Sequence, residues 1–193
     1  AVFRSGITPS ALEFIERDAI DWTLRYIDFD LQIPDKVQAH LLVEVDGDDI
    51  DLLYKDCEQI TEVMDQFDCG DILLADSERQ KEQLWKLRRS ISEAVKSNSV
   101  YKEEDTVVPR AELAKLLKGV KNIGNKYGFK SVCYGHAGDG NLHVNILKGS
   151  MSDEDWNTKL TFGIREIFEI TKKLGGTISG EHGIGFVQKD YMN

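Results

Sequence analysis

The chain has 193 residues, 41% of them hydrophobic and 30% charged, so it can bury the core of one large domain or two small ones. Its formal net charge is -10 and it has no lysine-rich run, which argues against a nucleic-acid partner. No apolar stretch approaches the roughly 20 residues that cross a bilayer, and the first residues lack the regions of a signal peptide, so we expect a cytoplasmic protein.

The three cysteines, Cys57, Cys69 and Cys133, show no Cys-x-x-Cys spacing. An odd number of thiols without that spacing argues against a disulfide framework and against a structural zinc knuckle. Free cysteine is among the residue types most often buried. We therefore interpret these residues as small buried side chains in a reducing compartment.

The first half of the chain predicts alternating helices and strands. Pro9 suits a first helical turn, and the apolar residues after it recur at helical spacing. An Asp-Gly-Asp-Asp run at residues 46–49 predicts a turn that caps the following helix, and Asp76-Ser77 predicts a second cap. The expected elements are a helix over 9–24, a strand over 38–46, a helix from 50 to about 67, a strand over 72–75 and a helix from 78 to about 96.

The second half predicts a more regular order. We expect strands over 101–108, 131–137, 141–147 and 177–179, with helices over 109–127 and 153–174. That order is βαββαβ, the arrangement of a ferredoxin-like α+β fold, in which an antiparallel sheet carries helices packed on one face. No linker is visible, so residues 1–193 are expected to form one domain.

The segment Tyr134-Gly-His-Ala-Gly-Asp-Gly-Asn-Leu-His-Val-Asn145 carries the strongest chemical signal. Its Asp139-Gly140 pair predicts a two-residue type I′ hairpin turn. Counting outward from that turn places His136 opposite His143, with their Cβ atoms about 4.5–5.5 Å apart. Two imidazoles at that separation could share one metal ion.

A third ligand is best supplied by Gly180-Glu-His-Gly-Ile-Gly185. Glu181 would complete a His, His, Glu set that leaves a position open, as in catalytic metal sites. His182 would then be available as an acid or base, and Asn145 shares a strand face with His143. Taken alone, Glu181 is more often an ordinary loop carboxylate. As a phosphate-binding loop the segment is weak, because it matches neither nucleotide-binding glycine motif.

A second polar cluster lies on the predicted helix that ends near residue 96. Arg88 and Ser92 are four residues apart and share one helix face, so Arg88 could hold a carboxylate through its planar fork beside the Ser92 hydroxyl. Lys102 could add positive charge. By composition alone, however, arginines on amphipathic helices are mostly solvated, which favours a surface role.

Together these segments resemble the C-terminal domain of the FAD-linked oxidases, the group that contains D-lactate dehydrogenases, the glycolate oxidase D subunit and D-2-hydroxyglutarate dehydrogenase. The resemblance covers nearly the whole chain. It is carried by Ser5-Gly-Ile-Thr-Pro-Ser-Ala-Leu-Glu-Phe14, Leu84-Trp-Lys-Leu-Arg-Arg89, Gly135-His-Ala-Gly-Asp-Gly-Asn-Leu-His143 and Ser179-Gly-Glu-His-Gly-Ile-Gly185.

The resemblance implies a role for each candidate residue. A divalent metal, zinc, manganese or iron, would be bound by His136, His143 and Glu181, and His182 would act as the base. The implied contacts to substrate are Arg88, Ser92, Lys102 and Asn145, and the implied contacts to the flavin cofactor are Glu181 and Gly183.

The implied reaction is the oxidation of a small 2-hydroxy acid, of the glycolate or D-lactate type, to the 2-oxo acid with hydride transfer to FAD. In this group FAD is bound mainly by an N-terminal domain. We therefore expect residues 1–193 to be a C-terminal cap and substrate fragment that binds flavin poorly by itself and is inactive alone.

The expected partners are the FAD-binding domain of the same protein and electron-transfer subunits, which could attach the enzyme to a membrane. Two other interpretations stay open: a metal-dependent hydrolase and a noncatalytic ferredoxin-like sensing module.

Overall fold

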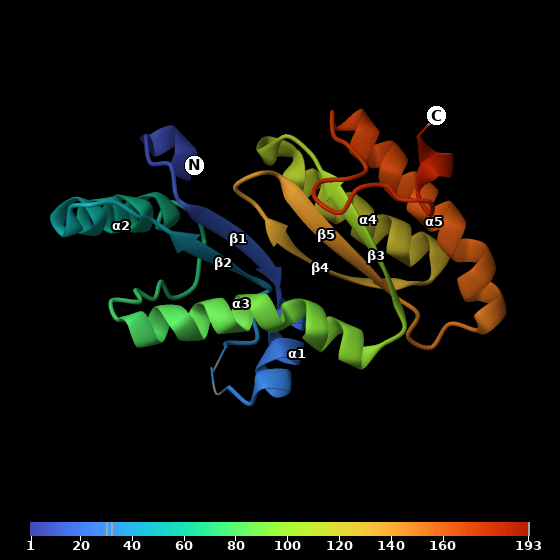
Figure 1. The fold of residues 1–193 in the computed structure, drawn as a ribbon, viewed down its shortest axis with the longest axis horizontal. Coiled ribbons are helices and arrows are strands. Elements are labelled where there is room, and N and C mark those ends of the chain that lie inside the picture. The colour runs from blue at the N-terminus through green and yellow to red at the C-terminus, as the bar shows by residue number, and fades with distance from the viewer. Residues whose placement is uncertain (30, 32, 193) are drawn as a thin grey trace.

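The computed structural model describes residues 1–29, 31 and 33–192, and in them one antiparallel sheet runs through the molecule (Figure 1). Its strand order is β2-β1-β4-β5-β3. The strands are β1 (Ala11–Glu16), β2 (Ala39–Glu44), β3 (Tyr101–Val107), β4 (Lys130–His136) and β5 (Asn141–Leu147).

Helices cover both faces of this sheet. The helices are α1 (Arg17–Ile27), α2 (Ile50–Met64), α3 (Glu78–Asn98), α4 (Leu113–Tyr127) and α5 (Asp153–Lys173). α4 and α5 lie on one face, while α1 and α3 pack together on the other, and α2 extends beyond the end of the sheet formed by β1 and β2 (Figure 1). No helix within the described residues is long and apolar enough to cross a membrane.

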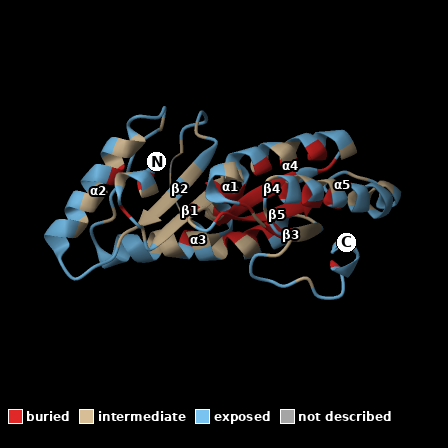
Figure 2. Ribbon diagram, turned by 90° about the horizontal axis from the view of Figure 1, so that it is seen from above, coloured by how far each residue is buried: buried red, intermediate tan, exposed pale blue. Residues whose placement is uncertain are grey.

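The core divides into two main clusters because successive side chains of a strand point to opposite faces. On β5, Leu142, Val144 and Ile146 face α4 and α5 in the larger cluster. The side chains between them, His143 and Asn145, therefore point to the face that carries α1 and α3. Figure 2 shows the buried residues concentrated in β4 and β5 and in the helices beside them. One face of these strands thus serves mainly packing, whereas the other contains buried polar groups.

The α+β class and the antiparallel sheet are confirmed. The order of β4, β5 and β3 is that of the predicted βαββαβ unit, and its two helices, α4 and α5, share one face as expected. The expectation that helices lie on one face only is wrong for the whole domain. α1 and α3 come from the N-terminal half and bury the opposite face against Ile15, Val132 and Tyr134.

The predicted helix over residues 9–24 is wrong in its first part, because residues 11–16 form β1 and only Arg17 begins a helix. β1 lies inside the sheet, between β2 and β4. Phe14 packs into the cluster under α4 and α5, whereas Ile15 packs into the cluster under α1 and α3. A strand that is apolar on both faces lacks simple alternation and cannot be distinguished from a buried helix by periodicity.

Two predicted short strands are also wrong or reduced. Residues 72–75 are not in a strand, and Ile72, Leu73 and Leu74 are exposed. Of residues 177–179, Thr177 alone forms an isolated antiparallel bridge, to Val107. A short apolar run forms a strand only where a neighbouring strand is available to pair with it. The periodicity of the run does not show whether such a neighbour is present.

The predicted helix caps are confirmed. The Asp49 side chain accepts hydrogen bonds from the backbone N–H groups of Asp51 and Leu52 at the start of α2. Ser77 precedes α3, where the Gln80 side chain accepts from the Ser77 backbone N–H. These contacts satisfy backbone donors that have no partner within the helix. The α3 cap fixes where the helix that carries Arg88 begins.

Candidate functional site

The hairpin between β4 and β5 forms as predicted, but its register differs. Tyr134, not His136, lies opposite His143. A type I′ turn needs positive φ at both central residues, yet of the Asp139-Gly140 pair only Gly140 has it, at 78°. The connection is instead a longer loop anchored on β1, since the Gly138 N–H donates to the Leu12 carbonyl at 2.9 Å.

This register shift moves the pairing by two residues and so preserves the face on which the histidines lie. His136 becomes the diagonal neighbour of His143, and their ring centroids are 5.9 Å apart. Diagonal neighbours on one face of an antiparallel pair remain within reach of long side chains. The prediction that the two imidazoles lie close together is therefore correct, although the reasoning from the turn is wrong.

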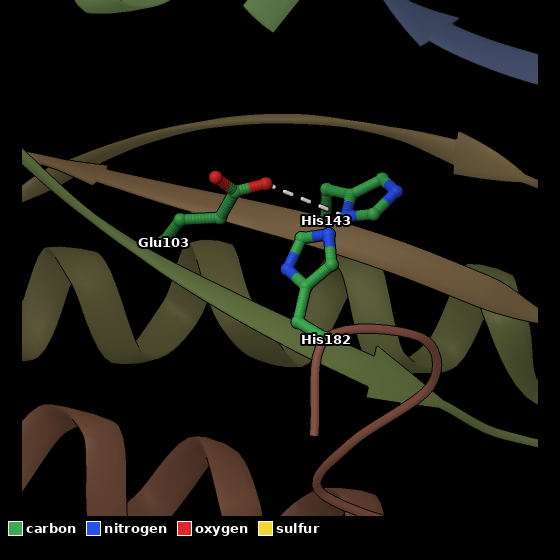
Figure 3. Close-up of side chains that lie close together, drawn as sticks. All are labelled: Glu103, His143 and His182. Carbon is green, nitrogen blue, oxygen red and sulfur yellow. Dashed lines mark ion pairs between the residues drawn. The ribbon is translucent and has the colours of Figure 1, made fainter. Parts of the chain in front are cut away.

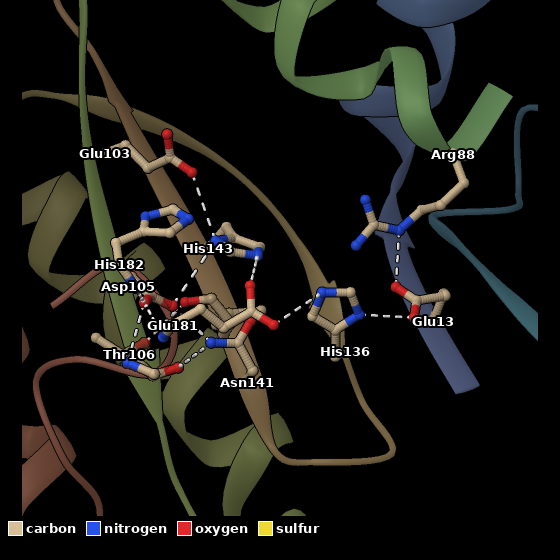
Figure 4. Close-up of polar contacts among 12 residues, drawn as sticks. Glu13, Arg88, Glu103, Asp105, Thr106, His136, Asn141, His143, Glu181 and His182 are labelled. Carbon is tan, nitrogen blue, oxygen red and sulfur yellow. Dashed lines mark hydrogen bonds and ion pairs between the residues drawn. The ribbon is translucent and has the colours of Figure 1, made fainter. Parts of the chain in front are cut away.

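The structure brings the three predicted ligands together (Figure 4). His136 Nε2 lies 3.4 Å from Glu181 Oε1, and His143 Nε2 lies 4.0 Å from Glu181 Oε2. One candidate ligand atom from each of the three residues lies within 4.8 Å of the others. Two imidazole nitrogens and one carboxylate oxygen at this spacing fit a divalent metal that keeps positions open for further ligands.

The Nδ1 atom of each histidine also lies close to a carboxylate. Glu13 Oε1 lies 2.7 Å from His136 Nδ1, and Glu103 Oε1 lies 3.4 Å from His143 Nδ1. Glu103 and His143 form a second group of candidate ligands with His182, whose ring stacks on that of His143 at 5.3 Å (Figure 3). Both groups use His143, and a neutral imidazole offers one lone pair, so the two are alternatives.

Asp105 fixes the loop that carries Glu181 and His182. Its Oδ2 accepts from the backbone N–H groups of Gly180, Glu181 and His182, at 3.0, 2.6 and 2.9 Å. Its Oδ1 accepts from the Asn141 side chain at 2.6 Å. Burial raises the pKa of the Asp105 carboxyl, but the hydrogen bonds from the loop backbone outweigh it, so that pKa is lowered.

The pocket above the histidines lies between the sheet and α3. It has a volume of about 300 Å³ and is lined by Arg88, Ser92, Lys96, Glu103, Tyr134, His136, His143, Glu181 and His182. Arg88 Nε donates to Glu13 Oε2 at 2.7 Å, and its guanidinium lies 5.3 Å from the centroid of the Tyr134 ring. Arg88 is therefore not the solvated surface arginine that composition alone favours.

The other predicted substrate residues are placed unequally. Ser92 lines the pocket beside Arg88. Asn145 is buried on the same sheet face as His143, and among the described residues its Nδ2 meets no hydrogen-bond acceptor. Lys102 projects to the opposite face, where its Nζ lies 3.7 Å from Glu104 Oε1. The structure does not bring Lys102 to the pocket, and the lysine that lines it is Lys96, which the sequence pattern did not indicate.

The predicted cofactor contact Gly183 lies in the exposed loop after His182. Its φ is 69°, and a Cβ built on it would meet nothing within 4 Å. The backbone conformation thus favours glycine there, and the space beside it is open.

The ionisation of the site follows from burial and pairing. Burial, with the charges of His182 and Arg88 nearby, lowers the pKa of His143 to about 4 despite the opposing charge of Asp105. The hydrogen bond to Glu13 raises the pKa of His136. Burial raises the pKa of Glu13, but the hydrogen bond with His136 and the Arg88 guanidinium outweigh it and lower that pKa. His143 is therefore a neutral ring, ready to bind a metal, at neutral pH.

Sequence reasoning missed three acidic residues of the site, Glu13, Glu103 and Asp105. The alternation of Glu103 and Asp105 on the predicted strand over 101–108 was a usable signal, since residues two apart share a strand face. Glu13 could not be found in this way, because its segment was predicted to be helical. Their partners are far apart in the chain, so only the sheet pairing shows the contacts.

The fold and the pocket define the class of this protein: an α+β domain with a pocket rich in histidines and carboxylates on one face of an antiparallel sheet. The family model for FAD linked oxidases, C-terminal domain, matches residues 1–193. The chain belongs to this family.

Curated relatives agree with that assignment. The chain is 30% identical over 195 residues to a D-lactate dehydrogenase of Anaerostipes hadrus, with 98% of the chain and 41% of that protein covered. It is 32% identical over 194 residues to the glycolate oxidase subunit GlcD of Bacillus subtilis, covering 99% and 40%. It is 40% identical over 125 residues to a D-2-hydroxyglutarate dehydrogenase of Stutzerimonas stutzeri, covering 63% of the chain and 27% of that protein. The chain thus spans about two fifths of the length of the first two relatives.

Proposed function

We propose that this chain is the substrate-binding part of a flavin-dependent oxidoreductase that oxidises a small 2-hydroxy acid to the 2-oxo acid. The observation that carries the proposal is the grouping of His136, His143 and Glu181 in one pocket with Arg88. A 2-hydroxy acid presents a hydroxyl and a carboxylate on adjacent carbons. The metal-ligand group would bind the hydroxyl, and Arg88 would bind the carboxylate.

His136, His143 and Glu181 would hold zinc, manganese or iron, because two imidazoles and one carboxylate suit all three. The donor set fits such an ion, since buried His143 has its pKa lowered to about 4 and needs no deprotonation at neutral pH. When bound, a divalent metal lowers the pKa of a coordinated hydroxyl. The three ligand side chains line the pocket in which the substrate would bind.

Arg88 would orient the substrate carboxylate. Its Nε edge is held by Glu13, and no hydrogen bond joins its terminal nitrogens to any other described residue, so both would form the parallel pair of hydrogen bonds that a carboxylate accepts. Ser92 and Lys96 line the same pocket and would add a hydroxyl donor and a positive charge. A planar, bidentate contact fixes the rotation of the bound acid as well as its position.

His182 would take the hydroxyl proton. It lines the pocket, its ring stacks on His143, and the Asp105 carboxylate holds its backbone N–H. A base fixed beside the substrate hydroxyl removes a proton as the Cα hydride leaves. FAD, when bound, supplies the hydride acceptor, and Glu181 and Gly183 are the residues of this chain that we expect to contact it. The FAD-binding domain would belong to the remaining length of the protein, and electron-transfer subunits would reoxidise the flavin.

Metal analysis of the purified chain tests the ligand set. After incubation with zinc, manganese or iron and gel filtration, the wild type should retain about one metal per chain. The double variant His136→Ala/His143→Ala should retain none, whereas His40→Ala, which removes a histidine outside the pocket, should behave like the wild type. Equal retention by the double variant would contradict the ligand assignment and favour the noncatalytic sensing module.

Activity tests the reaction. The full-length protein, with its flavin band visible in the absorption spectrum, should oxidise glycolate, D-lactate or D-2-hydroxyglutarate with a dye as electron acceptor. Arg88→Met should raise KM far more than the same change at Arg79, near the start of α3. The 193-residue chain alone should show no flavin band. Hydrolysis of an ester or amide without flavin would support the metal-dependent hydrolase instead.

A further inference from the structure

Glu13 joins the two halves of the proposed site. It lies on β1 directly opposite His136 on β4, and it is only 4% exposed. Its two carboxylate oxygens have different partners: Oε1 lies 2.7 Å from His136 Nδ1, and Oε2 accepts from Arg88 Nε at 2.7 Å. One buried carboxylate therefore contacts both a proposed metal ligand and the proposed substrate anchor (Figure 4).

The contact with His136 determines which ring nitrogen is free. An ionised carboxylate can only accept hydrogen bonds, so a hydrogen bond to Glu13 places the proton of the neutral ring on Nδ1. The lone pair then lies on Nε2, the atom that is 3.4 Å from Glu181 Oε1. Without Glu13 the neutral ring could place its proton on either nitrogen, and one of the two forms cannot bind a metal through Nε2.

The contact with Arg88 fixes the direction of the guanidinium. The side chains of both residues are nearly buried, at 11% and 5% exposed for Arg88 and Glu13. With Nε engaged, the plane of the guanidinium is set by Glu13 below it and by the Tyr134 ring beside it. The terminal nitrogens remain as the donors that point to the pocket.

We propose that Glu13 is a positioning residue that fixes the Nδ1–H form of His136 and the orientation of Arg88 at the same time. This inference rests on the proposed function, and it adds to it a residue that contacts neither metal nor substrate. Glu13 orients the metal ligand and the carboxylate anchor from a single point, so the spacing between metal and substrate carboxylate is set by β1. A bound 2-hydroxy acid needs that spacing to be constant.

Substitution by glutamine separates this role from simple packing. Glutamine has the size of glutamate but only one acceptor oxygen, and its amide group is a donor. His136 Nδ1–H and Arg88 Nε–H are both donors, so Glu13→Gln can satisfy only one of them. The matched control is Glu44→Gln, because Glu44 also joins the sheet to α3, through Trp85 Nε1 at 2.6 Å, but does not touch the pocket.

The test measures the metal-free chain first. In ¹⁵N NMR above the titration range of the histidines, the wild type and Glu44→Gln should show His136 as the Nδ1–H form and slow exchange of the Arg88 Nε–H. Glu13→Gln should show either a mixture of the two ring forms or fast exchange of that N–H. Arg88→Lys keeps the Glu13–His136 contact and should therefore keep the Nδ1–H form of His136. If Glu13→Gln does not fold, an Nε2–H ring in Arg88→Lys contradicts the proposal.

Zinc alone is the probe in the second measurement. If His136 shows both ring forms in Glu13→Gln, this variant should lose about 10–100-fold in zinc affinity, the range found when a group that orients a metal-binding histidine is removed. Glu44→Gln should bind zinc as the wild type does. A wild-type His136 in the Nε2–H form, or unchanged zinc affinity in a folded Glu13→Gln chain whose His136 shows both ring forms, would overturn the proposal. If the wild type binds no zinc, the metal in the proposed function fails, while the ring form and the Arg88 exchange still decide the role of Glu13.

Discussion

Asp105→Asn should release the loop that carries Glu181 and His182. In the wild type one carboxylate accepts three backbone N–H groups through Oδ2 and the Asn141 side chain through Oδ1. An asparagine keeps one acceptor oxygen and turns the other into a donor. If that donor faces the loop, it meets three backbone N–H groups, none of which can accept its proton. If it faces Asn141, it finds an acceptor only when the Asn141 amide turns over, which gives up the donation from Asn141 Nδ2 to the Thr106 carbonyl.

The magnitude follows from the number and kind of hydrogen bonds that the substitution removes. A hydrogen bond to a charged group contributes about 1.5–3 kcal/mol, and a buried donor left without a partner costs about 1–3 kcal/mol. These contributions overlap, and the exposed loop can relax toward water. We expect the free energy of unfolding to fall by about 2–4 kcal/mol, which is large for a single substitution.

Two assays check this reasoning. Urea unfolding at neutral pH should show a lower midpoint with an unchanged slope, and hydrogen exchange should become faster at the amides of Gly180, Glu181 and His182. The control is Asp48→Asn, at an exposed carboxylate outside the site. Unchanged exchange at these three amides, or a loss of stability no greater than in the control, would refute the role given to Asp105.

The same variant has a defined pH dependence. The folded-state pKa of Asp105 lies below its ordinary value of 3.8. Its contribution is therefore fully present above pH 3.8 and is lost as the pH falls through the lower folded value. The difference in stability between wild type and Asp105→Asn should be constant near neutral pH and should narrow in acid. A difference that widens in acid would contradict the sign of this pKa shift.

Three further predictions concern other parts of the domain. Burial raises the pKa of the Cys133 thiol to about 12, so maleimide should label the other two cysteines in the native chain and Cys133 only after denaturation, as mass spectrometry can show. Gly140→Ala should lower the free energy of unfolding, measured in urea, by at least about 2 kcal/mol, because its Cβ would lie 1.9 Å from the Val108 carbonyl oxygen at a φ of +78°. The control Gly149→Ala should lower it less, since a Cβ there meets no atom within 4 Å. The pKa of His143 falls from 6.5 to about 4 on folding, so the metal-free chain should lose about 3 kcal/mol of stability as the pH falls from 6.5 to 4. His143→Gln should reduce this dependence of stability on pH. If the dependence persists in that variant, His143 is not its source.

Much of the site could be predicted because its chemistry is concentrated in two short segments. The hairpin segment supplies His136 and His143, and the glycine-rich segment supplies Glu181 and His182. The face on which the histidines lie survived a wrong register, since an error of two residues returns to the same face of a strand. Local sequence was sufficient wherever the partners lie within one segment.

The rest depended on contacts between distant segments. Glu13 was hidden because a strand buried on both faces resembles a helix in its pattern. The direction of Lys102 follows from the pairing of β3 with β5, and its neighbour Glu103 takes the place in the pocket instead. Which of two adjacent strand residues enters a site is decided by the register of the whole sheet.

The alternation along β5 has a consequence for how this domain can change. Leu142, Val144 and Ile146 belong to the core, and the two residues between them belong to the pocket side, so one strand serves two separate requirements. Deleting a single residue in β5 would exchange the two sets at once, placing an imidazole in the core and aliphatic groups in the pocket. Insertions and deletions in β5 should therefore not be tolerated among related sequences. Single substitutions on the α3 surface above the pocket, by contrast, leave the core untouched. Divergence in substrate preference is expected to accumulate on that helix rather than on the strand beneath it.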